Sequence, residues 1–382
     1  MPGERRSWPP VTWLHVGFAL TGVGTTLFGC ILPALNLNWH LGDRRAGILF
    51  ATQFTGSTLG ALLVRSDFFR SLVSGYFLLI ASAISLTFFN GLVEMLLFFA
   101  FGLGIGLTMT ATSMLIGSTS LKNRGAALSL LNAVWGLGAA LTPVIASLWV
   151  RRWSPTYLFL ILGVVLLATF ALIGKNRADF IGGSRTKAEP SSSQVELKLV
   201  ALFAVIAFLY VGTEVSVSGW MMTYVGRLPI SSKDWAPIAA SAFWVALLCG
   251  RMLVPAIVRW LSEAHLLTAS VTSAFVGILL LVLSSAPIAI VLSATVAGLA
   301  LAPVFPLCLA RVLTLMHDSP KSKWIFAISG LGGAVLPWIT GELSAQSGSL
   351  RVGLSVPVFA LGAMIIVDRL GSGRRVSDQE SP

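Results

Sequence analysis

Charged residues are scarce in this sequence. Asp, Glu, Lys and Arg together make up 11% of its 382 residues, whereas hydrophobic residues make up 55%. Soluble domains carry about 25% charged residues, which keep their surfaces hydrated. The mean hydropathy of +0.86 points the same way. The shortage of charge excludes a large soluble protein, and we expect an integral membrane protein.

Several kinds of functional site are also missing. The three cysteines, Cys30, Cys249 and Cys308, lie in separate apolar runs, without the close spacing of a disulfide framework or a metal site. The sequence has no phosphate-binding glycine loop, so ATP does not drive this protein. Paired catalytic carboxylates and a nucleophile with its base are lacking as well. We therefore expect neither an enzyme nor a bound cofactor.

The basic residues lie in short clusters between apolar runs, although they give the chain a formal net charge of +11. A nucleic-acid-binding protein needs a solvated basic domain, which this sequence does not contain. Basic clusters beside apolar runs are instead typical of cytoplasmic loops. We expect contact with a lipid bilayer and none with nucleic acid.

Long apolar runs dominate the chain. A transmembrane helix needs about 20 predominantly apolar residues. On that criterion the sequence predicts an all-α membrane protein with twelve spans, at residues 12–35, 46–65, 71–89, 92–117, 125–149, 155–174, 198–224, 236–258, 264–285, 287–314, 323–345 and 350–369. The first span is long for a signal peptide and lacks a cleavage site, so we interpret it as an uncleaved helix.

One long polar stretch, residues 175–197, divides the spans into two sets of six. Its glycines and serines are typical of a flexible linker. We expect an N-terminal six-helix bundle over residues 1–174 and a C-terminal bundle with a short tail over residues 198–382. If the spans alternate in direction, 18 of the 26 Lys and Arg residues lie on the side of the linker and seven on the other. This bias predicts a multi-pass protein of the cell inner membrane with both termini in the cytoplasm.

The two halves resemble each other in sequence. The run Gly136-Leu-Gly-Ala-Ala-Leu-Thr-Pro143 recurs 194 residues later as Gly330-Leu-Gly-Gly-Ala-Val-Leu-Pro337. Further positions match at the same or nearly the same shift: Gly56 with Gly250, Val64-Arg65 with Val258-Arg259, Gly22 with Gly212, and Gly29 with Gly219. Two similar six-span halves joined by a cytoplasmic linker are typical of secondary transporters, whose substrate site lies between the halves.

Through its twelve spans, its repeat and the glycine–proline motif at Gly136–Pro143, the whole chain resembles the major facilitator superfamily. The resemblance implies the major facilitator fold, with two pseudo-symmetric halves of six helices. The superfamily's signature after the second span is degenerate here. Gly60 and Arg65 match it, but Val64 stands where an acidic residue is expected.

Several stretches are similar to the fucose permease-type sugar transporters. These are Tyr210-Val-Gly-Thr-Glu214 with Gly219-Trp220 and Tyr224, Leu131-Asn132, and Ala302-Pro303-Val-Phe-Pro306. The similarity implies transport of a sugar or related polyol, commonly coupled to a proton or sodium ion. Fucose permeases use acids in the first and fourth spans for this coupling. Here Asp43 and Glu94 lie only at the outer ends, where we expect water to solvate them.

Glu214 is the main candidate for the site. It interrupts a run of apolar or small residues from Leu199 to Met222. A charge at the bilayer centre costs about 2.5–3.5 kcal/mol, so such residues usually face a cavity. A structural hydrogen bond to a neighbouring helix is the alternative. The acid could bind the substrate, the coupling cation or both.

A sugar site also needs amides or hydroxyls for hydrogen bonding and flat apolar surface for the ring. The further substrate-binding candidates are Asn132, Gln53, Trp220, Tyr224 and Tyr210. Buried amides also serve as links between helices, and tryptophans more often belong to a core or an interface belt. A regular helix would not direct all the candidates after Glu214 at one ligand, so we expect a helix partly broken at Gly212 and Gly219. Arg251 is expected to extend toward the membrane surface or to bind a helix C-terminus.

We therefore expect a monomeric secondary active transporter of a sugar or related solute, working by alternating access and coupled to a proton or sodium ion at Glu214. An exporter of drugs or amphipathic metabolites is the alternative, because polar groups within the spans are few. A receptor or scaffold that moves no solute is a third possibility, but the short loops argue against it. The sequence does not decide the solute, the ion or the direction.

Overall fold

The computed structural model describes residues 10–89, 91–119, 124–175, 197–229, 234–308 and 323–379. These residues form helices and turns, and no strand is found among them. The helices of the N-terminal half are α1 (Pro10–Trp39), α2 (Asp43–Leu62), α3 (Phe68–Leu86), α4 (Leu92–Thr119), α5 (Arg124–Val150) and α6 (Tyr157–Lys175). Those of the C-terminal half are α7 (Leu197–Gly226), α8 (Trp235–Ile257), α9 (Glu263–Leu283), α10 (Pro287–Leu301), α12 (Lys323–Ser347), α13 (Leu350–Gly353) and α14 (Ser355–Gln379).

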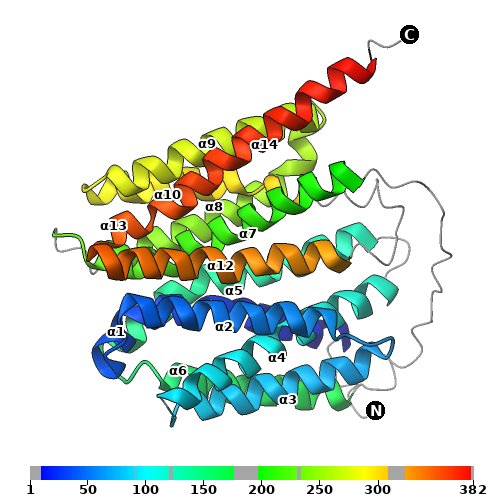
Figure 1. Cartoon of the computed structure of the whole chain (residues 1–382). Coiled ribbons are helices and arrows are strands. Elements are labelled where there is room, and N and C mark those ends of the chain that lie inside the picture. Colours follow the sequence, from blue (N-terminus) through cyan, green and yellow to red (C-terminus); the bar gives the residue numbers. More distant parts are fainter. Residues whose placement is uncertain are drawn as a thin grey trace, which may run out of the picture.

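The long helices run side by side along one direction, with the N-terminal half stacked against the C-terminal half (Figure 1). The first residues of α1 and the last residues of α14 lie at the same end of the bundle, which we call the terminal end (Figure 1). The opposite end, where α1 turns into α2, is called the far end. Successive long helices alternate in direction between these two ends.

The expected all-α protein with twelve spans in two halves is confirmed. Ten of the described helices are long and apolar enough to cross a membrane. The other two long helices, α2 and α12, pack against each other where the halves meet. The expected linker lies outside the described residues apart from its two ends, and so does the last part of the span expected at 287–314.

Local sequence sets where these helices begin. Within a membrane the backbone must satisfy its hydrogen bonds internally, so each apolar run becomes a helix. At the terminal end the Asp67 carboxylate accepts a hydrogen bond from the backbone N–H of Arg70 (3.0 Å) and caps α3. At the far end His40 has a φ of 51°, which reverses the chain between α1 and α2 and places Asp43 in the first turn of α2.

The halves meet through three helix pairs: α2 on α12, α5 on α8, and α1 on α7. The first two pairs are equivalent, because the shift of 194 residues relates α2 to α8 and α5 to α12. Glycines bring the facing backbones close together. A Cβ atom at Gly29 would lie 2.7 Å from the carbonyl oxygen of Gly219, and one at Gly341 would lie 3.0 Å from the Cα of Gly47. Any larger residue would force these helices apart.

Candidate functional site

A central cavity of about 200 Å³ lies between the two halves. The N-terminal half lines it with Thr25, Thr26, Gly29, Phe50, Phe54, Ser57, Ile105, Met109 and Trp135. The C-terminal half lines it with Val211, Glu214, Val215, Ser218, Gly219, Trp244 and Gly330. Both halves therefore contribute to one site, which is where the sequence repeat predicts a substrate to bind.

A larger cavity of about 640 Å³ adjoins the central one on the side of the terminal end. The two cavities share the lining residues Phe54, Ser57, Met109 and Gly330. The larger cavity extends to Arg65, which follows α2 and is exposed. Together the cavities form a route between the central site and the terminal end.

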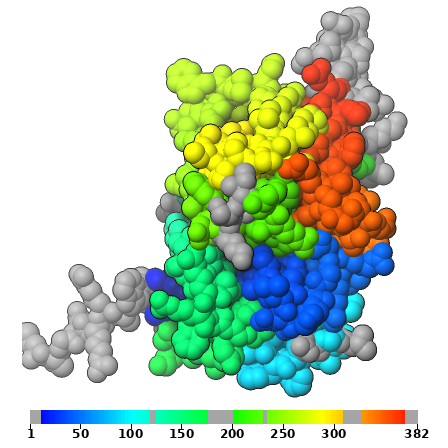
Figure 2. All heavy atoms as spheres, turned by 90° about the vertical axis from the view of Figure 1, so that its left-hand side faces the viewer, coloured from blue at the N-terminus to red at the C-terminus, as the bar shows by residue number. Residues whose placement is uncertain are grey.

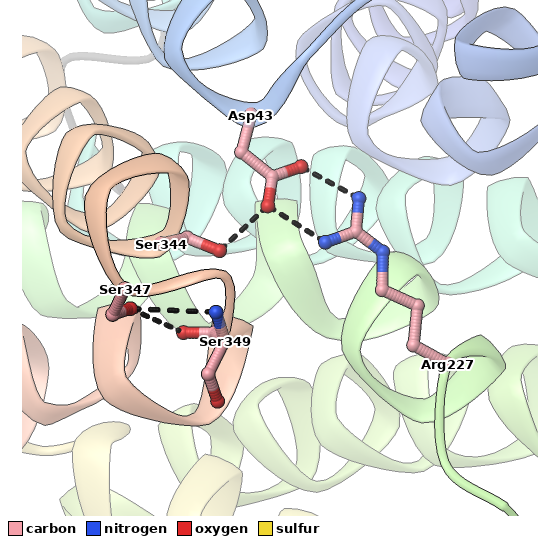
Figure 3. Close-up of polar contacts among 5 residues, drawn as sticks. All are labelled: Asp43, Arg227, Ser344, Ser347 and Ser349. Carbon is pink, nitrogen blue, oxygen red and sulfur yellow. Dashed lines mark hydrogen bonds and ion pairs between the residues drawn. The ribbon is translucent and has the colours of Figure 1, made fainter.

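At the far end, by contrast, polar contacts join the halves (Figure 3). The guanidinium of Arg227 donates two hydrogen bonds of 2.6 Å to the Asp43 carboxylate, and the Ser344 hydroxyl donates a third of 2.6 Å. A two-point arginine–carboxylate contact is strong and geometrically specific. Only 9% of the Asp43 side chain is exposed. The expectation that water solvates Asp43 is therefore wrong, because the carboxylate is enclosed between α2, α7 and α12.

Two further ion pairs cross between the halves at this end. Arg44 of α2 contacts Glu342 of α12 at 2.8 Å, and Arg151 pairs with Asp234 just before α8. Figure 2 looks onto the far end, where blue atoms of the N-terminal half lie directly against orange and green atoms of the C-terminal half. In this conformation the site is closed at the far end and connected to the terminal end.

The expectation that water solvates Glu94 is also wrong. Its side chain is fully buried, with Arg45 at 2.6 Å and the backbone N–H of Gly91 donating to it. Burial removes water, but a partner of opposite charge compensates for the loss. Glu94 therefore has a structural role within the N-terminal half and does not reach the central cavity.

Glu214 lines the central cavity from α7. Its Oε2 accepts hydrogen bonds from the hydroxyl of Tyr210, one helical turn earlier, and from the Arg251 guanidinium of α8 at 3.0 Å. The same guanidinium nitrogen lies 3.1 Å from the Tyr210 hydroxyl. No described residue donates to Oε1 of Glu214. We call Tyr210, Glu214 and Arg251 the Glu214 cluster, in which one carboxylate oxygen is held and the other is available to a ligand.

Arg251 differs from its expected role, because it contacts Glu214 and does not extend to the membrane surface. The two charges are mostly buried, with 22% of the Arg251 side chain and 11% of the Glu214 side chain exposed. Buried charges are tolerated when they are paired and hydrogen-bonded. The ring of Tyr210 stacks on Phe305 at a centroid distance of 5.7 Å, which fixes the hydroxyl beside the pair.

The structure distributes the amide candidates differently. Asn132 lines the larger cavity, where its side chain is exposed and donates to the backbone carbonyl of Leu128 at 2.9 Å. Gln53 is buried behind the central lining and donates to the carbonyl of Thr25 at 3.3 Å. Its Oε1 is buried without a partner among the described residues. Neither amide lies beside Glu214 in the central cavity lining.

The expected break in the seventh span is wrong, because α7 is continuous from Leu197 to Gly226. A continuous helix presents Glu214 and Ser218 to the cavity and directs the aromatic candidates elsewhere. The indole Nε1 of Trp220 donates to the Pro337 carbonyl at 3.1 Å, and the Tyr224 hydroxyl donates to the Val282 carbonyl at 2.9 Å. Both rings are buried and hold α7 against neighbouring helices.

Two tryptophans line the cavity, and one of them, Trp135, was not considered from the sequence. Trp135 of α5 and Trp244 of α8 come from opposite halves, and their rings meet edge to face at a centroid distance of 5.5 Å. The indole Nε1 of Trp135 is buried without an acceptor among the described residues. The available signal was the position of Trp135 directly before the repeated Gly136-Leu-Gly138 motif.

These groups define what the cavity can bind. Trp135, Trp244, Phe50 and Phe54 provide apolar and aromatic surface. The free oxygen of Glu214 accepts hydrogen bonds. A small neutral solute with hydroxyl groups and an apolar ring face matches this combination. Among the described residues no group of three or more His, Cys, Asp or Glu side chains is placed to hold a metal ion.

Comparison with known proteins agrees with this architecture. The glucose/mannose transporter GlcP of Bacillus subtilis is 24% identical over 372 residues, covering 92% of this chain and 91% of GlcP. The crystal structure of the transporter FucP in the outward conformation superposes with a TM-score of 0.63 at 14% identity, covering 95% of this chain and 98% of FucP. A peptide transporter, POT, in complex with sulfate superposes with a TM-score of 0.76 at 14% identity, covering 98% of this chain and 96% of POT.

The family model described as the Major Facilitator Superfamily matches residues 14–323. The match begins within α1 and extends to the start of α12, so it spans most of both halves. The chain therefore belongs to the Major Facilitator Superfamily and is a membrane transporter, not an enzyme.

Proposed function

We propose that this protein transports a sugar or a related small polyol. The observation that carries the proposal is the central cavity, where aromatic walls from both halves surround one carboxylate oxygen without a protein donor. Sugars offer hydroxyl donors to such an oxygen and a C–H face to such walls. The name of GlcP, a glucose/mannose transporter, supports the same substrate class.

Transport proceeds by alternating access of the two halves. The described conformation has its route at the terminal end and its closure at Asp43, Arg227 and Ser344. To load or release solute on the other side, the halves must separate at these contacts and approach each other at the terminal end. With both termini in the cytoplasm, as the distribution of Lys and Arg favours, this conformation faces the cytoplasm.

The second part of the proposal is cation coupling at Glu214. A proton or sodium ion that reaches this carboxylate competes with Arg251, which already neutralises it at 3.0 Å. A cation that takes the place of the guanidinium changes the charge of the site and thus the free energy of reorientation. The protein is proposed to act in this way as a monomer, since each chain contains both halves of the site.

Uptake of radiolabelled hexoses into proteoliposomes tests both parts. We expect wild-type protein to take up a hexose, and an inward proton or sodium gradient to drive accumulation above the external concentration. In preparations whose elution volume is unchanged, Glu214→Gln should lose accumulation. The Asn132→Ala variant serves as the matched control, because its side chain lies outside the central cavity.

The outcomes separate the parts of the proposal. Gradient-independent equilibration by the wild-type protein would contradict coupling but leave sugar transport intact. Unchanged accumulation in Glu214→Gln would contradict the role of the carboxylate. Absence of any hexose uptake or sugar-induced thermal shift, together with resistance of expressing cells to amphipathic toxins, would overturn sugar transport and establish an exporter.

A further inference from the structure

A third cavity, of about 550 Å³, lies outside the transport route at the far end of α5. It is lined by Ile145, Leu148, Trp149, Arg151, Arg152 and Trp153. None of these residues lines the central or the larger cavity. We call it the α5 hollow. It combines apolar, tryptophan and arginine side chains, a composition typical of the membrane–water interface.

An apolar stripe leads along α5 into this hollow. Leu137, Leu141, Ile145 and Leu148 are all exposed, and their spacing of three or four residues places them on one face of the helix. From Leu137 to Leu148 the stripe is about 17 Å long at 1.5 Å per residue. One leaflet of a bilayer is about 15 Å thick, half of a hydrocarbon core of about 30 Å. The stripe thus matches the length of a lipid acyl chain that ends at the hollow.

Two tryptophans form the wall of the α5 hollow. The rings of Trp149 and Trp153 lie 6.0 Å apart at an angle of 32°. The indole Nε1 of Trp149 donates to the Ser154 carbonyl at 3.0 Å, which fixes that ring, whereas Trp153 is 58% exposed. Tryptophans gather at the membrane interface, where their rings lie at the level of the lipid headgroups. The wall therefore stands at the depth where a lipid glycerol and phosphate would lie.

The two arginines of the hollow have different partners. Arg151 pairs with Asp234 across the halves, whereas no ion pair of Arg152 is found in the part of the chain that the structure describes. The hollow therefore has an excess positive charge. Arginine binds phosphate oxygens through two parallel N–H groups, so it is suited to a phosphate at the end of the apolar stripe.

We propose that the α5 hollow binds an anionic phospholipid, such as phosphatidylglycerol. Arg152 binds the phosphate, Trp149 and Trp153 contact the glycerol region, and one acyl chain lies along the stripe from Leu148 to Leu137. The anionic class follows from charge complementarity, because none of the six lining residues is acidic and Asp234, which contacts the hollow through Arg151, is already paired. Arg152 is exposed and its side chain makes no ion pair among the described residues, so we expect its substitution to leave the fold intact.

Native mass spectrometry of the detergent-purified full chain tests this proposal. The probes are phosphatidylglycerol and phosphatidylcholine with identical acyl chains. We expect wild-type protein to retain phosphatidylglycerol selectively and Arg152→Gln to bind it about tenfold more weakly, because a charge-assisted hydrogen bond is lost. Trp153→Leu should weaken binding less. Arg351→Gln is the matched control, since Arg351 is also an exposed arginine of the far end but lies outside the hollow.

Four results would overturn the proposal. Equal retention of the two lipids would show that charge does not select the occupant. An equal loss in Arg152→Gln and Arg351→Gln would show a general surface effect. Inhibition of phosphatidylglycerol binding by millimolar inorganic phosphate, or self-association that Trp153→Leu abolishes, would assign the hollow to a free anion or to a second copy of the chain.

Discussion

The two halves share one plan of helices but differ in the middle of the membrane. The C-terminal half carries the Glu214 cluster, whereas the repeat places Leu20, Gly24 and Ser57 at the equivalent positions of the N-terminal half. At Gly24, the ring of Phe101 lies where a side chain would extend, 3.2 Å from an added Cβ. At these equivalent positions, the charged residues therefore lie in the C-terminal half only. We propose that the C-terminal half binds the polar groups of a substrate, while the N-terminal half mainly supplies the facing wall of the cavity.

The largest effect should come from breaking the pair on the charged half. Arg251→Gln leaves Glu214 as an uncompensated buried charge, which costs about 3–5 kcal/mol. We expect a large fall in the midpoint of thermal unfolding in detergent and loss of transport in proteoliposomes. The double variant Glu214→Gln with Arg251→Gln should recover most of the stability and none of the transport. A stable and active Arg251→Gln would show that the halves do not differ in the way we infer.

The spans, the repeat and Glu214 can be predicted from the sequence alone, whereas the partner of Glu214 cannot. The twelve spans and the repeat follow from long apolar runs and from glycines at fixed shifts, because lipid demands helices and close helix packing demands glycine. Glu214 is detectable because a single acidic residue in a long apolar run is costly within a bilayer and therefore usually functional. Its partner Arg251 is not assignable in this way, since α7 and α8 meet only through tertiary packing.

The aromatic residues show the same limit. The direction of a ring depends on helix rotation, so Trp220 and Trp135 are alike in sequence but not in the fold. Trp220 bonds to α12, and Trp135 lines the cavity. Likewise, the ion pairs that enclose Asp43 and Glu94 join residues of different helices, and no local pattern marks them.

A second comparison concerns two sets of contacts that join the halves at the far end, one where α2 meets α12 and one where α5 meets α8. Asp43 is enclosed by Arg227 and Ser344, whereas the Arg151–Asp234 pair is exposed. Exposed pairs contribute little, and buried charge-assisted hydrogen bonds contribute about 1.5–3 kcal/mol. Asp43→Asn should therefore shift the population toward a conformation open at the far end by about tenfold. Asp234→Asn should shift it much less.

Labelling of a cysteine introduced at Ser218 measures this shift, in a background without the three native cysteines. A membrane-impermeant thiol reagent applied to the far side of the membrane should react faster in Asp43→Asn than in Asp234→Asn. Ser218 lines the central cavity, so its label reports access to the site itself. Equal rates in the two variants would show that both closures contribute alike and that burial of Asp43 is unimportant.

Two tryptophans on opposite halves allow a smaller effect to be measured. Trp135→Phe removes an indole N–H that has no acceptor among the described residues, so stability should change little. If this N–H binds the substrate, affinity should fall about fivefold, as for one hydrogen bond of about 1 kcal/mol. Trp220→Phe removes the hydrogen bond from the indole to the Pro337 carbonyl. For this variant we expect lower stability and an unchanged affinity for the substrate. Sugar titrations by thermal shift report both quantities, and identical behaviour of the two variants would contradict the assignment.

The smallest effect is expected at Asn132, a polar residue of the N-terminal half that lines the larger cavity. Its amide already donates to the Leu128 carbonyl, and its exposed side chain exchanges hydrogen bonds with water at little cost. Asn132→Ala should therefore change the half-saturating sugar concentration by less than about twofold, since a hydrogen bond exchanged with water contributes little to binding. Uptake assays over a range of concentrations measure this directly. A large loss of affinity would mean that the larger cavity is itself part of the binding site. Polar recognition would then be shared between the halves, despite the absence of charge at Leu20, Gly24 and Ser57.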